Sequence, residues 1–198
     1  MACYARCVAE PARQAFSFDA YLELEEVSPV KHEFLRGEVW AMAVGTPDHA
    51  AISVNVSTLL STALRGRPCR VYSSDLRIRV LATGLGTYPG VTVVCGKPEF
   101  DSADRKQQTV TNPRLIVEVL SPSTANDDRG EKLTHYQQIT SLEEVVLVAH
   151  DEQRIDVWRR AGEGWTLNSL SAGTVQLYSV DVEIPLAEIY RNPFGDVA

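Results

Sequence analysis

Residues 114–120 read Arg-Leu-Ile-Val-Glu-Val-Leu, and this stretch decides how the rest of the chain is interpreted. Its aliphatic and β-branched side chains predict a strand that is buried on both faces of a sheet. Glu118 stands inside this apolar run. An unpaired carboxylate in a protein interior is costly, so a buried Glu118 requires a metal, a cation or a proton. If the strand instead exposes one face, Glu118 is simply solvated, and the pattern alone leaves both interpretations open.

Helix and strand patterns surround this stretch. The elements predicted before it are a helix at 17–26, a hairpin at 32–42, a helix at 46–66, and strands at 70–80 and 91–95. After it, the sequence predicts a helix at about 128–138, capped by Asn126 or Asp127, and then a meander of strands. Runs of strands with few helices indicate an α+β fold rather than a doubly wound sheet.

Length and composition indicate ordinary globular structure. The chain has 198 residues, of which 44% are hydrophobic and 23% charged. At about 150 residues per domain, this length favours one domain with some elaboration. We therefore expect an N-terminal extension over residues 1–15 and a single domain over residues 16–194.

The sequence also predicts a cytoplasmic protein without a membrane span. No apolar run approaches the roughly 18 residues that cross a bilayer, and residues 1–10 lack the pattern of a signal or transit peptide. The cysteines show no spacing typical of zinc ligands. In the cytoplasm all four are expected to be reduced thiols: Cys3, Cys7, Cys69 and Cys95.

The charge distribution is uneven. The formal net charge is -7, so any contact with nucleic acid must come from a local basic patch. Five arginines fall between Arg65 and Arg79, with only Asp75 opposing them. One interpretation is a solvated helix end and strand face. The other is a phosphate-binding strip that includes four of these arginines: Arg65, Arg67, Arg77 and Arg79.

Three further residues are candidates to act with Glu118. Glu33 lies on the predicted hairpin, Asp75 lies on a neighbouring predicted strand, and Lys132 lies one turn into the helix that follows Glu118. Carboxylates that hold a hard cation beside a lysine are typical of metal-assisted phosphodiester hydrolysis. The lysine would stabilise the charge that develops on the phosphoryl group. Spacing alone does not establish that these side chains meet.

The chain resembles the Uma-type putative restriction endonuclease family, within the PD-(D/E)XK nuclease superfamily. The resemblance extends from Phe16 to about Phe194, and Ile116 to Lys132 is its most specific part. The segments that carry it are residues 16–22, 31–38, 73–79, 87–94 and 112–136.

The resemblance implies a restriction-endonuclease-like α+β core. Its central mixed β-sheet would be flanked by helices, with an additional antiparallel strand meander at the C-terminus. It implies Mg²⁺ as cofactor, with Mn²⁺ as a substitute, DNA as the partner and a homodimer as the assembly. Glu118 matches the acidic residue of the (D/E)XK half, and Lys132 matches a lysine moved to the following helix, because Leu120 occupies the usual lysine position. Glu33 matches the N-terminal acidic residue, and Asp75 matches a recurrent aspartate of lower rank.

The chain departs from the family pattern at one position. The Pro-Asp motif reads Pro89-Gly90 here, so the aspartate that would be a principal metal ligand is missing. Three explanations stay open: a degenerate nuclease, a substitute carboxylate such as Asp75, or an isolated change in an active lineage. The resemblance thus implies a metal-dependent DNA endonuclease, and impairment at Gly90 is one of the open explanations. The alternative is a catalytically inactive nuclease-fold module that binds nucleic acid or a protein partner.

Overall fold

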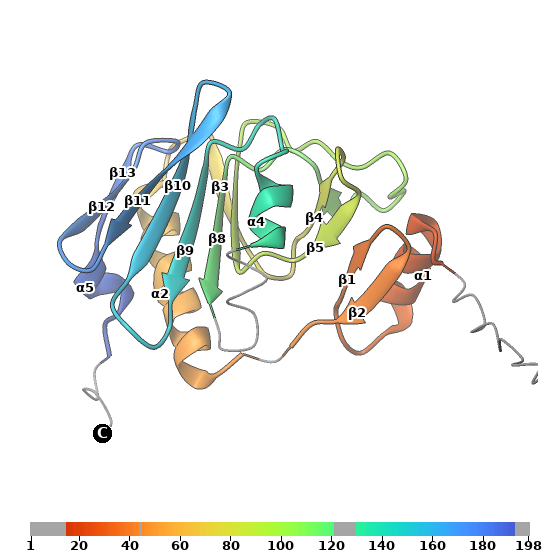
Figure 1. The fold of residues 1–198 in the computed structure, drawn as a ribbon, viewed down its shortest axis with the longest axis horizontal. Coiled ribbons are helices and arrows are strands. Elements are labelled where there is room, and N and C mark those ends of the chain that lie inside the picture. The colour runs from red at the N-terminus through yellow and green to blue at the C-terminus, as the bar shows by residue number, and fades with distance from the viewer. Residues whose placement is uncertain (1–14, 44, 121–129, 193–198) are drawn as a thin grey trace, which may run out of the picture.

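The computed structural model of the chain describes residues 15–43, 45–120 and 130–192. Its strands form two mixed sheets and a separate antiparallel pair (Figure 1). The large sheet has the order β11 (Gly164–Leu170), β10 (Ile155–Ala161), β9 (Glu144–Ala149), β8 (Leu115–Leu120), β6 (Val91–Cys95) and β3 (Cys69–Ser73). The small sheet has the order β2 (Glu38–Ala41), β1 (His32–Leu35), β5 (Leu85–Thr87), β4 (Arg77–Val80) and β7 (Thr109–Val110).

Strand β8 lies in the middle of the large sheet and is buried along its whole length. It pairs in parallel with β9 and antiparallel with β6. Helix α2 (Pro47–Ala63) covers one face of the sheet, and the short helix α4 (Glu131–Tyr136) covers the other (Figure 1). Because both faces are covered, the apolar run of β8 packs against two separate hydrophobic clusters. The predicted doubly buried strand is confirmed.

Helix α1 (Phe18–Val27) packs beside the small sheet (Figure 1). The helix begins where the sequence predicts, because the Ser17 side chain accepts a hydrogen bond from the Ala20 N–H. Strands β1 and β2 form the predicted hairpin. Its turn uses positive φ angles at Arg36 (51°) and Gly37 (93°), the region that glycine adopts without steric cost.

The C-terminal third consists mainly of antiparallel strands. β9, β10 and β11 form a meander in the large sheet. β12 (Thr174–Leu177) then pairs with β13 (Val182–Pro185), and α5 (Leu186–Ile189) follows. Mixed sheets with few helices confirm the α+β class and its additional antiparallel strands. No helix in the described part of the chain is long and apolar enough to cross a membrane.

Two predicted elements differ in their limits. The strand expected over residues 70–80 is two strands, β3 and β4, which belong to different sheets. A turn at Ser73 separates them, because the Leu76 N–H bonds the Ser73 carbonyl (3.1 Å) and the Ser73 hydroxyl accepts from the Asp75 N–H (3.3 Å). Helix α4 is shorter than predicted, and its expected caps at 126–127 lie outside the described residues.

The prediction of reduced thiols is wrong for Cys69 and Cys95. The two residues are direct partners across the β3–β6 pair, with Cα atoms 3.9 Å apart, and they form a disulfide. Strand register decides which cysteines face each other, and spacing in the sequence does not reveal it. Cys3 and Cys7 lie outside the described residues.

Candidate active site

Three of the four predicted catalytic residues meet where the two sheets adjoin. Glu33 comes from β1 of the small sheet, Glu118 from β8 of the large sheet, and Lys132 from α4. The Lys132 ammonium lies 2.8 Å from Glu33 Oε1 and 4.0 Å from Glu118 Oε1. The side chains of all three are about nine-tenths buried. One ammonium therefore faces two largely desolvated carboxylates, an arrangement that needs further hydrogen bonds to be stable.

Neutral donors hold each carboxylate in place. Trp40 donates its indole N–H to Glu33 Oε2 at 3.1 Å, and the Thr87 hydroxyl donates to Glu33 Oε1. The Tyr136 hydroxyl donates to Glu118 Oε1 at 2.5 Å. Trp40, Thr87 and Tyr136 were not predicted as site residues from the sequence. Tyr136 left a signal, because it follows Lys132 by four residues and so shares its face of the helix.

Gly90 lies directly beside Glu118. Its backbone N–H donates to Glu118 Oε2 at 3.0 Å. A Cβ atom added at this position would lie 3.7 Å from Glu118 Oε2 and 3.2 Å from the Val117 carbonyl oxygen. The second distance is tight, so the backbone would have to give by a few tenths of an ångström. An aspartate at position 90 would thus bring another carboxylate close to Glu118.

Within the described residues, Asp75 does not join Glu33 and Glu118 in one cluster of acidic side chains. Asp75 lies in the turn between β3 and β4, and 81% of its side chain is exposed. It pairs with Lys31 at 2.6 Å and accepts a hydrogen bond from the Ser73 hydroxyl. The hydrogen bond and charge of Lys31 hold the pKa of Asp75 below its ordinary value. These contacts hold the Asp75 side chain at the surface, in the turn between β3 and β4.

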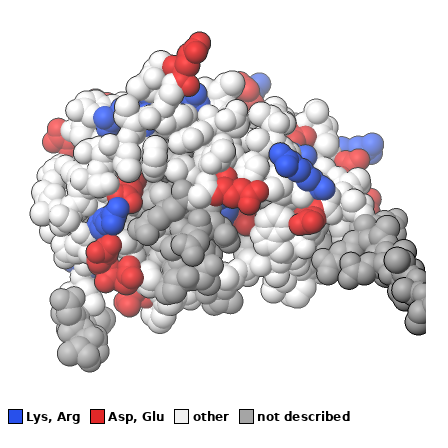
Figure 2. Space-filling model, viewed as in Figure 1, with Lys and Arg blue, Asp and Glu red and all other residues white. Residues whose placement is uncertain are grey.

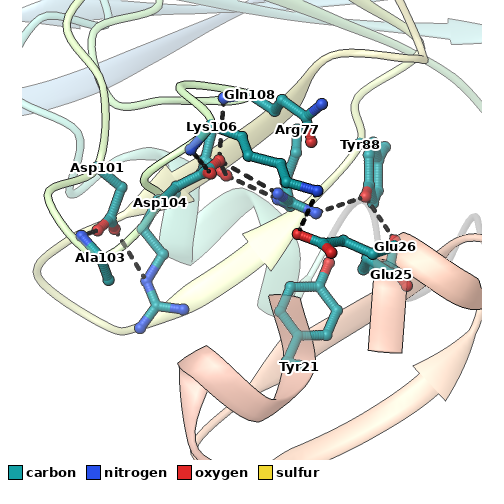
Figure 3. Close-up of polar contacts among 12 residues, drawn as sticks. Tyr21, Glu25, Glu26, Arg77, Tyr88, Asp101, Ala103, Asp104, Lys106 and Gln108 are labelled. Atoms are coloured by element: carbon teal, nitrogen blue, oxygen red, sulfur yellow. Dashed lines mark hydrogen bonds and ion pairs between the residues drawn. The ribbon is translucent and has the colours of Figure 1, made fainter. Parts of the chain in front are cut away.

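The four arginines do not form one exposed strip. Arg77 is only 5% exposed and lies between Tyr88 and Asp104 (Figure 3). Arg79 is largely buried, and its guanidinium stacks 3.4 Å from the centroid of the Phe18 ring. These two side chains are already engaged in the interior and are not placed to contact phosphates. The other two predicted phosphate contacts lie on the outside: Arg65 is exposed, and Arg67 donates to the Val180 and Asp181 carbonyls.

Surface charge is mixed on the face that carries α4. Among the described residues visible in Figure 2, Lys and Arg are scattered between Asp and Glu rather than gathered in one broad basic area. This agrees with the formal net charge of -7. Binding of a nucleic acid on this face would rest on a few local cations rather than on a general field.

The carboxylates offer the hard oxygen donors that Mg²⁺ and Mn²⁺ prefer. Within residues 15–43, 45–120 and 130–192, no three His, Cys, Asp or Glu side chains lie together as a metal-binding group. Glu33 and Glu118 therefore do not make an all-protein cage. They fit a cation held by one or two carboxylates and completed by water and phosphate oxygens, which is the usual way that proteins bind Mg²⁺.

One lysine thus faces two carboxylates where the two mixed sheets adjoin. Comparisons with known proteins show the family to which the chain belongs. Residues 18–186 match the model of the Uma2 family, described as "Putative restriction endonuclease". Since the match covers most of the chain, the protein belongs to this family.

Two proteins of Synechocystis sp. are similar in sequence. "Uncharacterized protein slr1290" is 38% identical over 177 residues, which are 88% of this chain and 90% of the relative. "Uncharacterized protein sll1609" is 32% identical over 158 residues, 79% of this chain and 88% of the relative. The fold is similar to a crystal structure from Anabaena variabilis titled as a putative nuclease belonging to DUF820. The TM-score is 0.72 at 16% identity, over 88% of this chain and 97% of the other.

Proposed function

We propose that this protein is a divalent-metal-dependent DNA endonuclease whose activity is limited by Gly90. The observation that carries the proposal is the position of the Lys132 ammonium, 2.8 Å from Glu33 and 4.0 Å from Glu118. The two carboxylates come from different sheets, so the fold brings them together over a long sequence separation. Membership of the Uma2 family supports nuclease chemistry and DNA as the substrate.

Glu118 and Glu33 are the residues that would hold Mg²⁺ or Mn²⁺. The ion would polarise a phosphoryl oxygen and lower the pKa of its bound water. Lys132 would stabilise the negative charge that grows on the phosphoryl oxygens during hydrolysis. Glu33 orients the ammonium of Lys132, and the Tyr136 hydroxyl orients the Glu118 carboxylate. Burial strengthens these interactions because water screens them poorly there.

Gly90 leaves the proposed metal site with one carboxylate fewer. The family motif supplies a carboxylate at this position, and here only the backbone N–H reaches Glu118. One fewer carboxylate lowers the affinity for a divalent cation. We therefore expect slow cleavage that requires high concentrations of Mg²⁺ or Mn²⁺.

Cleavage of supercoiled plasmid DNA in Mg²⁺ or Mn²⁺ tests the proposal. Gly90→Asp should cut faster than the natural protein, by roughly 100-fold or more, since one well-placed charged group is worth several kcal/mol in a desolvated site. Gly90→Ala is the matched control, because it adds the Cβ atom without the carboxylate. Glu118→Ala should abolish cleavage in either background. If neither the natural protein nor Gly90→Asp cuts DNA, the endonuclease proposal fails.

A second candidate function is a catalytically inactive nuclease-fold module that binds nucleic acid. The absence of a side chain at Gly90, whose backbone N–H lies 3.0 Å from Glu118 Oε2, favours it. This candidate predicts binding that weakens steeply with salt and does not need a metal. Charge reversal at Arg65 or Arg67 should weaken that binding. Arg77 is unsuitable for this test, because it is buried and its reversal would disrupt the fold.

We further propose a homodimer, since two strands of a duplex require two sites. Light scattering after size-exclusion chromatography measures the assembly directly. A monomer should only nick plasmid DNA, whereas a dimer should also linearise it.

A further inference from the structure

A single short segment contacts both carboxylates of the site. Residues 87–90, here called the crossover segment, lead from β5 in the small sheet to β6 in the large sheet. At its first residue, the Thr87 hydroxyl donates to Glu33. At its last residue, the Gly90 N–H donates to Glu118. The position of this segment therefore affects how the two carboxylates lie relative to each other.

Tyr88, inside the crossover segment, is tied down by two charged residues. Its hydroxyl donates to Glu25 Oε2 at 2.5 Å and accepts from Arg77 Nη1 at 3.0 Å (Figure 3). Tyr88 is 7% exposed and Arg77 5%. Burial and the hydrogen bond to Glu25 raise the pKa of Tyr88 to about 12, so the phenol keeps its proton at neutral pH. We call Tyr88, Glu25 and Arg77 the tyrosine clamp.

Each partner of Tyr88 is itself fixed by further contacts. Glu25 Oε1 accepts from His32 Nδ1 at 2.8 Å and from the His32 backbone N–H at 3.1 Å. Arg77 donates to the Thr109 hydroxyl at 2.7 Å and to Asp104 Oδ2 at 3.3 Å. The clamp thus connects α1, β1, β4 and β7 to the crossover segment. A buried network in which every member has partners favours one arrangement of its backbone.

We infer that Tyr88 is a positioning residue for both carboxylates: its clamp fixes the crossover segment and thereby the placement of Glu33 and Glu118. This inference rests on the proposed function for its catalytic consequence. It also gives a role to Arg77, which acts inside the protein rather than on phosphates. The Tyr88 hydroxyl bonds Glu25 and Arg77, and we assign its effect on the two carboxylates to Thr87 and Gly90.

Tyr88→Phe tests this inference, because it removes the hydroxyl and keeps the ring. Tyr190→Phe is the matched control: the Tyr190 hydroxyl also donates and accepts a hydrogen bond, with the carbonyl and N–H of Arg154, at the C-cap of α5. Hydrogen exchange of the Gly90 amide, followed by NMR, reports on the crossover segment directly. Tyr88→Phe should accelerate this exchange about tenfold, and Tyr190→Phe should leave it unchanged.

A second measurement separates positioning from general destabilisation. In the Gly90→Asp background, Tyr88→Phe should weaken Mn²⁺ binding about tenfold by calorimetry, while Tyr190→Phe should not. Unchanged Gly90 exchange and unchanged Mn²⁺ affinity in Tyr88→Phe would overturn the inference. If Tyr88→Phe does not fold, Glu25→Gln weakens the same hydrogen bond and is judged by the same readouts. If Gly90→Asp binds no Mn²⁺, the proposed function fails. The Gly90 exchange rate alone then tests whether the tyrosine clamp fixes the crossover segment.

Discussion

Two buried glutamates stand on neighbouring parallel strands and have different surroundings. Glu118 lies on β8 and Glu144 on β9. In the register of this pair Glu118 is opposite Leu147, and Glu144 is opposite Leu115. Alternate residues of a strand point to the same face of the sheet. The core residues two positions away therefore show that Glu118 lies on the face covered by α4 and Glu144 on the face covered by α2. The same residue type in the same kind of strand therefore meets two environments.

Glu144 is satisfied within its own surroundings. It is fully buried and accepts from Arg159 Nε at 2.8 Å, its direct partner on β10. Its other oxygen accepts from the Ser179 N–H at 2.9 Å and the Ser179 hydroxyl at 2.5 Å. The ion pair with Arg159 on β10 is one to one, and the Ser179 donors lie between β12 and β13. Such a group serves the fold.

Glu118 shares its lysine with a second carboxylate. Lys132 is closer to Glu33, on the other sheet, than to Glu118. Two carboxylates around one ammonium cost more desolvation and repulsion than a simple pair. Burial alone therefore does not distinguish the two glutamates. They differ because a second carboxylate, Glu33 from a distant part of the chain, lies beside the lysine that Glu118 faces.

Replacing Glu144 tests the structural side of the comparison and has the largest expected effect on stability. Glu144→Ala should lower the free energy of unfolding by about 3–5 kcal/mol, because it leaves the Arg159 guanidinium and the Ser179 N–H without their acceptor. Urea unfolding measures the change. Glu143→Ala is the control: its ion pair with Arg114 is about two-fifths exposed and should be worth about 1 kcal/mol or less. A similar loss in both variants would contradict the structural role of Glu144.

Raising the pH tests whether Tyr88 stabilises the part of the fold around Glu118. The pKa of Tyr88 is raised to about 12, above its ordinary value of 10.0. Its contribution to stability is therefore fully present below pH 10 and is lost as the pH rises through about 12, with a loss on the order of 2 kcal/mol. Urea unfolding between pH 9 and 12 should show a shallower decline for Tyr88→Phe than for the natural protein. Parallel declines would show that Tyr88 does not contribute.

Glu118→Gln should have the smallest effect on stability. Glutamine keeps one oxygen as an acceptor and removes one of the two negative charges beside Lys132. We expect a change of about 1 kcal/mol or less in urea unfolding, well below that of Glu144→Gln. A loss in the free energy of unfolding as large as that of Glu144→Gln would show that both glutamates stabilise the fold equally and would contradict the distinction between them.

The sequence predicted one of these glutamates and not the other for a physical reason. Glu118 interrupts an apolar run, so its charge stands out, whereas Glu144 follows Glu143 at the start of a strand and looks solvated. Its burial depends on Ser179, 35 residues away. Lys132 and Glu33 were candidates from their positions on predicted elements, and the family resemblance assigned them to one site, because local patterns do not show which side chains meet across two sheets.

The surroundings of Arg77 and Asp75 also differ from the prediction, because they too depend on contacts that are distant in the sequence. Arg77 alternates with apolar residues and so was expected to face outward. In the structure Asp104 and Thr109 cover and bind it. Asp75 was expected near Glu118, but the chain turns at Ser73 and carries Asp75 to the surface. Local periodicity predicted the elements, and strand register and loop packing decided the contacts.

The affinity of position-90 variants for Mn²⁺, measured by isothermal titration calorimetry, tests the central claim most directly. The claim is that Glu118 and Glu33 form a metal site that lacks one carboxylate at Gly90. Gly90→Asp should bind Mn²⁺ at least about tenfold more tightly than the natural protein, and Glu118→Gln should abolish the gain. Gly90→Asn, of the same shape without the charge, should bind no better than the natural protein. Equal affinity in Gly90→Asp and Gly90→Asn, or a gain that survives Glu118→Gln, would contradict the claim.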